Sequence, residues 1–134
     1  MEITYQSTLE GVAPDGVHGF FVGWADPPSP ATLLRMLEAS SHFWLALDGE
    51  RLVGYIRAVS DGFYAAFLPE LEVLPEYQGM GIGTTLLTRL LEDLRGFYSI
   101  DGACDDELVG YYQRFGFVRG NGMMIRRYEH QAAK

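Results

Sequence analysis

The sequence predicts one α/β (α+β) domain over residues 1–134, in which a mixed, mostly antiparallel sheet is flanked by helices. The turn dipeptides Asp48-Gly49 and Asp61-Gly62 separate three apolar extended runs, a pattern typical of an antiparallel meander. A leucine-striped helix follows the third run and leads into a further extended run, which indicates one parallel strand–helix–strand crossover. A length of 134 residues is ordinary for one domain.

The first 40 residues are expected to hold one short strand and one helix. Ile3 to Tyr5 is interpreted as the strand. The helix should begin at Ser29 and Pro30, because a serine hydroxyl can cap the first turn and proline lacks an N–H that has no partner there. Its apolar side chains recur at helical spacing: Leu33, Leu34 and Leu37.

The three extended runs lie at residues 43–47, 52–59 and 63–73. Pro69 interrupts the third run, and proline cannot donate a hydrogen bond to a neighbouring strand. We interpret it as a local break in strand pairing beside a functional site. The alternative is an ordinary proline of an edge strand.

The helix after these runs buries one stripe and exposes the opposite face. The stripe consists of Leu86, Leu87, Leu90, Leu91 and Leu94. Residues 97–103 are expected to form the crossover strand. Residues 107–115 should form a short helix that ends at Gly116.

The end of the chain is predicted to form a hairpin and a tail. Val118 and residues 123–128 would supply the strands, around a turn at residues 120–122. Residues 130–134 are expected to be frayed, as chain ends commonly are.

Composition limits the classes of binding partner and the cellular location to be expected. The net charge of −8 and the pI of about 4.7 are opposite to what binds phosphate backbones, so no nucleic acid partner is expected. No apolar stretch approaches the ~18 residues needed to cross a bilayer, so no membrane partner is expected. Cys104 is the only cysteine, which fits a reducing, cytoplasmic location. The three histidines show no metal-ligand spacing, and no metal is expected.

A glycine loop joins the third extended run to the leucine-striped helix. Glycines let a ligand approach the backbone, and the first N–H groups of a helix form an anion site that suits a pyrophosphate. The alternative is a glycine-rich turn without a ligand. The dinucleotide fingerprint G-x-G-x-x-G needs glycine as its sixth residue, which is Thr84 when counted from Gly79 and Leu86 when counted from Gly81. The Gly-Lys-Ser/Thr of a P-loop is also absent. The candidate binding residues are Gln78, Gly79, Met80, Gly81, Ile82, Gly83, Thr84 and Thr85.

Two segments carry a family resemblance. Residues 71–83 read LEVLPEYQGMGIG and resemble the acetyl-CoA signature, Gln/Arg-x-x-Gly-x-Gly/Ala, of the GNAT superfamily of N-acetyltransferases. Residues 111–117 read YYQRFGF and resemble the Phe-Tyr-x-x-x-Gly-Phe segment of the same family. The resemblance covers residues 42–118, with both motifs in the family's order.

The resemblance implies a GNAT-like fold with a splayed strand at the cofactor site, and acetyl-CoA as the co-substrate. It assigns cofactor contacts to the glycine loop and to the backbone around Leu71 and Val73. Tyr112 matches the family's general-acid position, four residues before Gly116. A phenol there can stabilise the departing thiolate by a hydrogen bond; the alternative is a tyrosine that only packs in the core.

A base for the reaction is sought on the same strand. Glu70 and Glu72 alternate with Leu71 and Val73, so their carboxylates should face away from those apolar side chains. Either one can accept the amine proton, directly or through water, or bind a cationic acceptor, and Glu72 is preferred. The alternative is a pair of solvated strand carboxylates.

The sequence therefore predicts an N-acetyltransferase that moves an acetyl group from acetyl-CoA to a primary amine by direct attack in a ternary complex. The alternative is a non-catalytic acetyl-CoA-binding sensor or interaction module. The acceptor would be a small-molecule or protein amine, and a homodimer is possible. Core packing is expected of Phe20, Phe21 and Trp24, with an acceptor pocket as the alternative. Cys104 is expected to be a small buried residue rather than a nucleophile.

Overall fold

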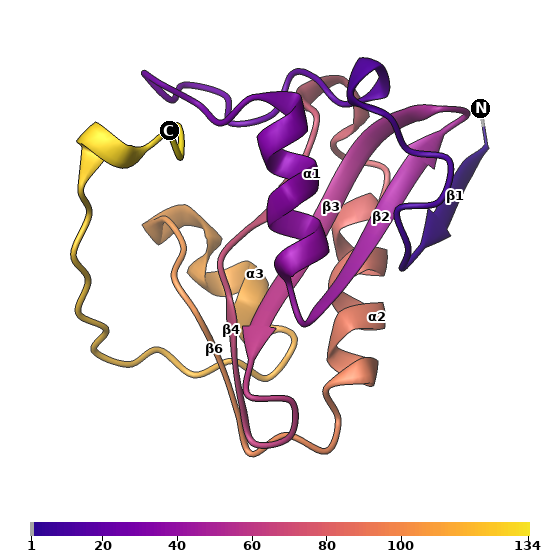
Figure 1. Cartoon of the computed structure of the whole chain (residues 1–134). Coiled ribbons are helices and arrows are strands. Elements are labelled where there is room, and N and C mark those ends of the chain that lie inside the picture. Colours follow the sequence, from indigo (N-terminus) through magenta and orange to yellow (C-terminus); the bar gives the residue numbers. More distant parts are fainter. Residues whose placement is uncertain (1) are drawn as a thin grey trace.

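A six-stranded sheet organises the computed structural model, which describes residues 2–134 (Figure 1). The strand order is β1-β2-β3-β4-β6, and β5 pairs with β3 beyond the end of β4. Only the β4–β6 pair among these strands is parallel; the others are antiparallel, as the meander and the crossover predict. The strands are β1 (Ile3–Gln6), β2 (His42–Asp48), β3 (Arg51–Ser60), β4 (Ala65–Leu68), β5 (Leu71–Val73) and β6 (Ser99–Gly102).

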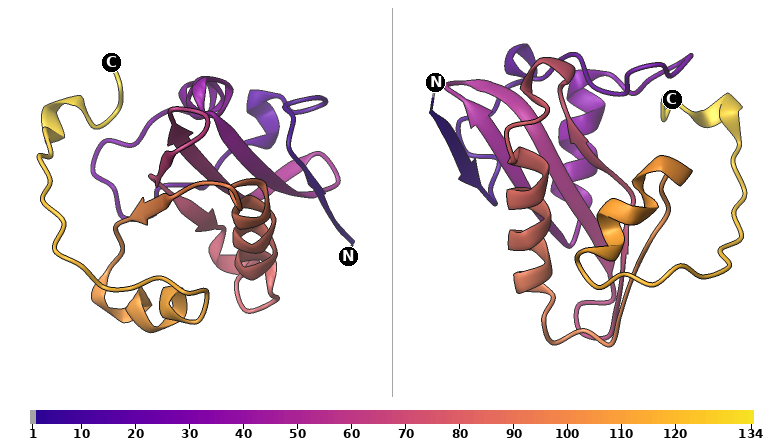
Figure 2. Two further views of the ribbon diagram at one scale, coloured as in Figure 1. Left: turned by 90° about the horizontal axis from the view of Figure 1, so that it is seen from below. Right: turned by 180° about the vertical axis from the view of Figure 1, so that it is seen from behind.

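Helices cover both faces of this sheet. The helix α1 (Pro30–Ala39) lies on one face and α2 (Ile82–Asp93) on the other, as the front and rear views show (Figures 1 and 2). The short helix α3 (Val109–Gln113) follows β6. Single 3-10 turns lie at Pro14–Gly16, Pro75–Tyr77, Asp106–Leu108 and Tyr128–His130.

Local sequence signals account for the two long helices. The Ser29 hydroxyl accepts a hydrogen bond from the backbone N–H of Thr32 at 3.1 Å, which is the predicted cap of α1. Leu33 and Leu37 then face the core. Leu91 of α2 is only partly buried, whereas the other four leucines of the predicted stripe are fully buried: Leu86, Leu87, Leu90 and Leu94.

The predicted break at Pro69 is confirmed. Before it, β4 pairs with β3 on one side and with β6 on the other. After it, β5 pairs only with β3. The sheet therefore opens between β5 and the continuation of β6, immediately beyond Leu68 and Gly102.

A glycine in the central strand sets how closely α2 approaches this opening. A Cβ atom on Gly54 would lie 3.3 Å from the Glu72 carbonyl oxygen and 3.3 Å from side-chain carbons of Ile82 and Leu86. Such distances are tighter than ordinary packing allows, so glycine lets β5 and the start of α2 press against β3. The glycine loop is thereby fixed against the broken strand.

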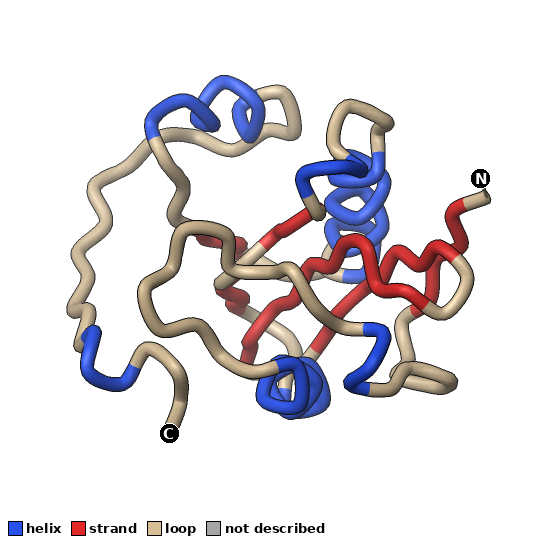
Figure 3. Tube along the Cα trace, turned by 90° about the horizontal axis from the view of Figure 1, so that it is seen from above, coloured by secondary structure: helices blue, strands red, loops and turns tan. Residues whose placement is uncertain are grey.

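The predicted C-terminal hairpin is wrong. Residues 118–127 contain no strand, and the chain runs as an exposed arc at the periphery of the molecule (Figures 1 and 3). The tail is not frayed either: it forms the turn at Tyr128–His130, and Ala132 is buried. The β propensity of residues 123–127 is not enough for a strand, because a strand also needs a partner, which local sequence does not reveal.

None of the helices within residues 2–134 has the length and apolar character to cross a bilayer.

Candidate active site

The glycine loop lies at the N-terminus of α2. Gly79 and Gly81 adopt φ values of +81° and +83°, in the left-handed region that other residues rarely occupy. The first intrahelical bond runs from Thr85 N–H to the Gly81 carbonyl at 3.0 Å. The N–H groups of Ile82, Gly83 and Thr84 precede that bond, so they are the donors an anion would use.

Side chains around the loop leave the backbone accessible. A Cβ atom on Gly79 or Gly81 would meet no atom of residues 2–134 within 4 Å. The Ile82 side chain is buried in the core, so only its N–H is available to a ligand. Met80 is exposed. This arrangement fits the pyrophosphate of acetyl-CoA, which needs donors without side-chain obstruction.

Tyr111 adds a polar group that the sequence did not reveal. Its hydroxyl lies 3.1 Å from Oγ1 of Thr84, and it is also the nearest atom, at 3.6 Å, to a Cβ built on Gly83. Its ring does pack against Phe115, but its hydroxyl reaches the first turn of α2.

The backbone of β5 presents unpaired groups to the opening in the sheet. Backbone hydrogen bonds join Arg57 to Glu70 and Val53 to Leu74. Because bonded and non-bonded pairs alternate in an antiparallel ladder, the bonded pair between these is Tyr55 with Glu72. The N–H and C=O groups of the two intervening residues, Leu71 and Val73, therefore face away from β3.

One side chain ties this strand to the glycine loop. The Gln78 amide donates to the Val73 carbonyl oxygen at 2.9 Å. Since that carbonyl is occupied, the Val73 N–H and the Leu71 backbone groups are what the strand offers to a ligand. Their position suits an extended pantetheine arm, which can pair with a strand edge through the main chain.

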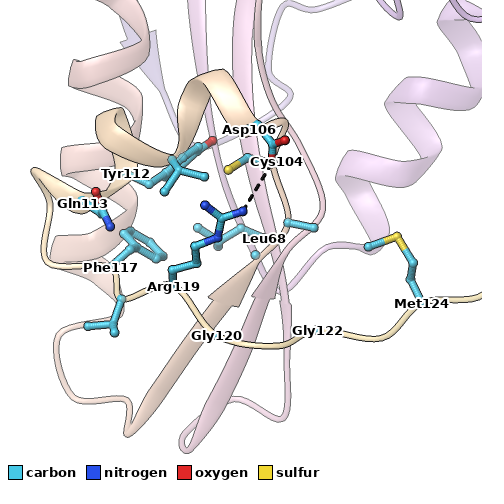
Figure 4. Close-up of a pocket in the computed structure, with 14 residues that line it drawn as sticks. Leu68, Cys104, Asp106, Tyr112, Gln113, Phe117, Arg119, Gly120, Gly122 and Met124 are labelled. Carbon is cyan, nitrogen blue, oxygen red and sulfur yellow. Dashed lines mark hydrogen bonds and ion pairs between the residues drawn. The ribbon is translucent and has the colours of Figure 1, made fainter.

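Tyr112 lines a cavity of about 270 Å³ at the end of β4 (Figure 4). The cavity lies between Leu68 and Cys104, with Phe117 against the tyrosine ring, and the glycine loop contributes no residue to it. Burial, with smaller effects of Cys104 and Tyr111, raises the pKa of Tyr112 to about 12. The phenol therefore stays protonated at neutral pH and acts as a hydrogen-bond donor.

Cys104 is exposed, so the expectation of a buried small residue is wrong. It follows β6 by two residues, where the chain has left the sheet and no second strand covers it. Its thiol lies near Tyr112 on the wall of the same cavity (Figure 4).

The two strand carboxylates have different surroundings, although both face the side of the sheet opposite α2. The Arg57 guanidinium donates to both carboxylate oxygens of Glu70, to Oε1 at 2.8 Å and to Oε2 at 2.9 Å. The Tyr55 hydroxyl also donates to Oε1 of Glu70, at 3.1 Å. Within residues 2–134 no arginine forms an ion pair with Glu72, whose Oε1 accepts a hydrogen bond from the backbone N–H of Phe21 at 2.5 Å. Burial raises the pKa of Glu72 above its ordinary value, although the hydrogen bonds from the Phe21 and Val22 N–H groups oppose the rise.

The aromatic residues before α1 divide between core and surface. Phe20 and Phe21 are buried, and the Phe20 ring meets Tyr55 edge-on at 5.4 Å. Trp24 is 43% exposed and packs against Phe21 with ring centroids 4.7 Å apart. Phe21 has φ of +61°, an outlying value for a bulky residue. The loop is thus held in an unusual shape with Glu72 beneath it.

Comparison with known proteins decides the family. The model of the acetyltransferase (GNAT) family matches residues 10–117. The chain belongs to the GNAT family of acetyltransferases. This GNAT protein is therefore classed with the acyltransferases, and membership implies acetyl-CoA as the co-substrate.

Solved structures and curated relatives agree with this assignment. A Deinococcus radiodurans R1 protein assigned as an acetyltransferase shares 44% identity and a TM-score of 0.94, over 97% of this chain and 92% of that one. A GNAT family acetyltransferase of Streptococcus pneumoniae TIGR4 shares 33% identity and a TM-score of 0.76, over 94% and 98%. Serotonin N-acetyltransferase 2, chloroplastic, of Oryza sativa subsp. japonica is 35% identical over 92 residues, 64% of this chain and 46% of the relative. This GNAT chain spans about half the length of the curated relatives it matches.

Proposed function

We propose that this protein transfers an acetyl group from acetyl-CoA to a primary amine by direct attack in a ternary complex. The single observation that carries the proposal is the Gln78–Val73 hydrogen bond of 2.9 Å. It joins an anion-binding helix terminus to the unpaired backbone of a broken strand, and one extended ligand with a pyrophosphate can use both. Tyr112 lies just beyond, at the end of β4.

In this proposal the cofactor is held mainly by main-chain groups. The N–H groups at the start of α2 bind the phosphates, and Thr84 and Thr85 lie in the same turn. The backbone of Leu71 and Val73 binds the pantetheine arm, with the Val73 N–H directed toward the acetyl oxygen. Acetyl-CoA supplies an acetyl group activated as a thioester.

We assign the proton-accepting role to Glu72. The attacking amine must lose a proton, and a carboxylate whose pKa is raised accepts one more readily than an ordinary carboxylate does. Glu70 is the weaker candidate because Arg57 engages both of its oxygens. As the nitrogen bonds to the acetyl carbon, the carbon–sulfur bond breaks, and the Tyr112 hydroxyl donates a hydrogen bond to the departing sulfur.

The acceptor is proposed to be a small-molecule amine or a protein amine that enters on the face with Glu72. The half-exposed Trp24 is the exposed aromatic side chain of the loop before α1, whereas Phe20 and Phe21 are buried. The proposal involves neither nucleic acid nor a membrane, and it includes a homodimer.

The test is thiol release from acetyl-CoA with a panel of primary amines, together with direct binding of acetyl-CoA by calorimetry. Gly83→Ala is the sharpest variant. Its added Cβ would meet Tyr111 and Val73 at the ordinary distances of 3.6 and 3.7 Å, so the fold should tolerate it. The added methyl group would obstruct a cofactor lying on the loop, so acetyl-CoA should bind at least about tenfold more weakly.

Gly110→Ala is the matched control, because it also adds a methyl group to a helix and meets nothing within 4 Å. Unchanged acetyl-CoA binding in Gly83→Ala would contradict the proposed site. Tight binding without turnover of any amine would contradict the enzyme and favour the non-catalytic sensor.

A further inference from the structure

Arg114 is an exposed arginine at the C-terminal end of α3. Among residues 2–134, no carboxylate forms an ion pair with its guanidinium. The side chain lies instead over the ring of Tyr111, with the guanidinium carbon 5.0 Å from the ring centroid. Such a stack favours one orientation of the guanidinium. Arg114 therefore offers an oriented positive charge that is available to a ligand.

Tyr111 brings this charge close to the proposed phosphate site. The hydroxyl of the same ring lies 3.1 Å from Oγ1 of Thr84, in the first turn of α2. It also lies 3.6 Å from a Cβ atom built on Gly83. One aromatic side chain thus contacts both the start of α2 and the guanidinium of Arg114, so an anion bound at that helix terminus has Arg114 as a neighbour.

The other arginines are engaged by protein groups or lie on other elements. Four of them form ion pairs with carboxylates: Arg51, Arg57, Arg95 and Arg119. Arg89, farther along α2, lies 4.9 Å from the ring centroid of Tyr5 and 5.0 Å from that of Trp44. The remaining three belong to α1 or to the C-terminal arc: Arg35, Arg126 and Arg127. Arg114 is therefore the arginine best placed for a ligand at the start of α2.

Acetyl-CoA carries a second anionic group besides its pyrophosphate. The 3′ oxygen of its ribose bears a phosphate monoester, with a charge of about −1.5 to −2 at neutral pH. The ribose is joined directly to the pyrophosphate, so the 3′-phosphate lies one sugar unit away from the helix terminus. A chain with a net charge of −8 needs a local cation to hold such a group. A guanidinium suits it, because its N–H groups match two phosphate oxygens at once.

We propose that Arg114 binds the 3′-phosphate of acetyl-CoA and makes this protein discriminate against cofactors that lack this group. The guanidinium, held on the Tyr111 ring, donates hydrogen bonds to the phosphate oxygens. Tyr111 is then a positioning residue for both anionic parts of the cofactor, since its hydroxyl contacts Thr84 and its ring orients Arg114. The inference rests on the proposed function, because it requires acetyl-CoA at the glycine loop.

The test compares the binding of two ligands, acetyl-CoA and its 3′-dephospho form, by calorimetry at low ionic strength. The unmodified protein should bind acetyl-CoA about tenfold more tightly than the dephospho form, a difference of about 1.4 kcal/mol. Arg114→Gln should bind acetyl-CoA as weakly as the dephospho form. Its affinity for the dephospho form should stay within about twofold of the unmodified value, which corresponds to less than about 0.5 kcal/mol.

Arg95→Gln is the matched control. It makes the same change in net charge at an exposed position just beyond the other end of α2. The 12 residues of α2 separate the two ends by about 18 Å, which exceeds the Debye length of about 10 Å at 0.1 M salt. Arg95→Gln should therefore keep the tenfold preference for acetyl-CoA. Loss of that preference in Arg95→Gln would assign the effect to net charge and overturn a specific contact with Arg114.

The two roles of Tyr111 can be separated in the same measurement. Tyr111→Phe keeps the ring and removes the hydroxyl, so it should weaken the binding of both ligands alike and keep their affinity ratio. Tyr111→Leu also removes the ring face under Arg114, so the ratio should fall toward one. A ratio that falls in Tyr111→Phe as far as in Tyr111→Leu would contradict the ring as the element that orients Arg114.

Failure of this inference and failure of the proposed function give different results. Equal binding of the two ligands by the unmodified protein, or equal losses for both ligands in Arg114→Gln, would overturn the role of Arg114 and leave the glycine-loop site intact. Binding of neither ligand would overturn the proposed function itself, and the role of Arg114 with it. The measurement is of binding alone, so it does not depend on finding the acceptor amine.

Discussion

The hydroxyl of Tyr111 lies 3.1 Å from Oγ1 of Thr84, and this contact joins α3 to the first turn of α2. It fixes the helix terminus that we propose to bind the cofactor phosphates. The neighbouring Tyr112 points elsewhere, into the cavity at the end of β4. Two adjacent tyrosines thus serve the two ends of the proposed cofactor site, and their phenylalanine variants should differ in kind.

Tyr111→Phe removes only the hydroxyl that reaches Thr84. A hydrogen bond contributes about 0.5–1.5 kcal/mol net, so the KM for acetyl-CoA should rise roughly 2–10-fold while kcat stays within about twofold. Steady-state kinetics with varied acetyl-CoA measures both. A lower kcat at unchanged KM would assign Tyr111 to the chemical step instead.

Tyr112→Phe should affect kcat rather than the KM for acetyl-CoA. Losing the hydrogen bond to the departing sulfur should lower kcat by about 10²-fold and leave the KM for acetyl-CoA nearly unchanged. Because the pKa of Tyr112 is about 12, no alkaline loss of activity below about pH 11 should come from this group. Equal kcat values for Tyr112→Phe and the unmodified enzyme would leave Tyr112 with a packing role only.

Glu72→Gln tests the base. The amide oxygen can still accept the Phe21 N–H, but the side chain can no longer accept a proton, so kcat should fall by about 10²–10⁴-fold. In the unmodified enzyme, activity should rise with pH through a pKa above the ordinary 4.5 of glutamate, and the variant should lack that step. A pH–rate profile of kcat with one amine of low pKa measures it. Glu70→Gln is the control, and it should keep the acidic step.

Glu72→Gln, which should lower activity, should at the same time stabilise the fold at neutral pH. A carboxyl whose pKa is raised on folding favours the folded state below the unfolded pKa, and that contribution is lost as the pH rises through the folded value. Glu72→Gln should therefore melt higher than the unmodified protein at pH 7 and show little difference near pH 4. Calorimetric melting at both pH values checks this. A lower melting temperature at pH 7 would mean that the ionised carboxylate stabilises the loop at Phe21.

Gly16→Ala should destabilise the fold. A Cβ there would lie 2.3 Å from the backbone carbonyl oxygen of Glu50, which cannot move without disturbing the β2–β3 turn. The expected loss is about 1–3 kcal/mol, or roughly 4 °C in Tm per kcal/mol. Gly110→Ala, with open space in a helix, should be neutral or stabilising by up to about 1 kcal/mol. Denaturant unfolding of both variants decides; equal stabilities would contradict the packing at Gly16.

Local signals in the sequence were enough for the features they determine directly. The Ser29 cap, the leucines of α2, the two Asp-Gly turns and the break at Pro69 each depend on residues close in the chain, and all are found. The turn at the glycine loop also depends on residues close in the chain, and Gly79 and Gly81 adopt positive φ there.

Features that depend on contacts distant in sequence were missed. The Tyr111–Thr84 bond spans 27 residues, and the Glu72–Phe21 bond spans 51. The ion pair of Arg57 with Glu70, which distinguishes Glu70 from Glu72, also joins β3 to the segment between β4 and β5. The C-terminal hairpin failed for the same reason, because extended backbone becomes a strand only where a partner lies beside it.

The polar groups at the break between β4 and β5 belong to the main chain. Substitution of Leu71 or Val73 by any residue except proline would keep their N–H and C=O groups, so the proposed cofactor contacts there are insensitive to point mutation. The opposite face of this segment presents Glu72 of β5 and, just before the strand, Glu70, whose identity any missense change would alter. If the proposed function is correct, this short segment has one side whose residues can change without loss of cofactor contacts and one side on which new amine preferences can be selected.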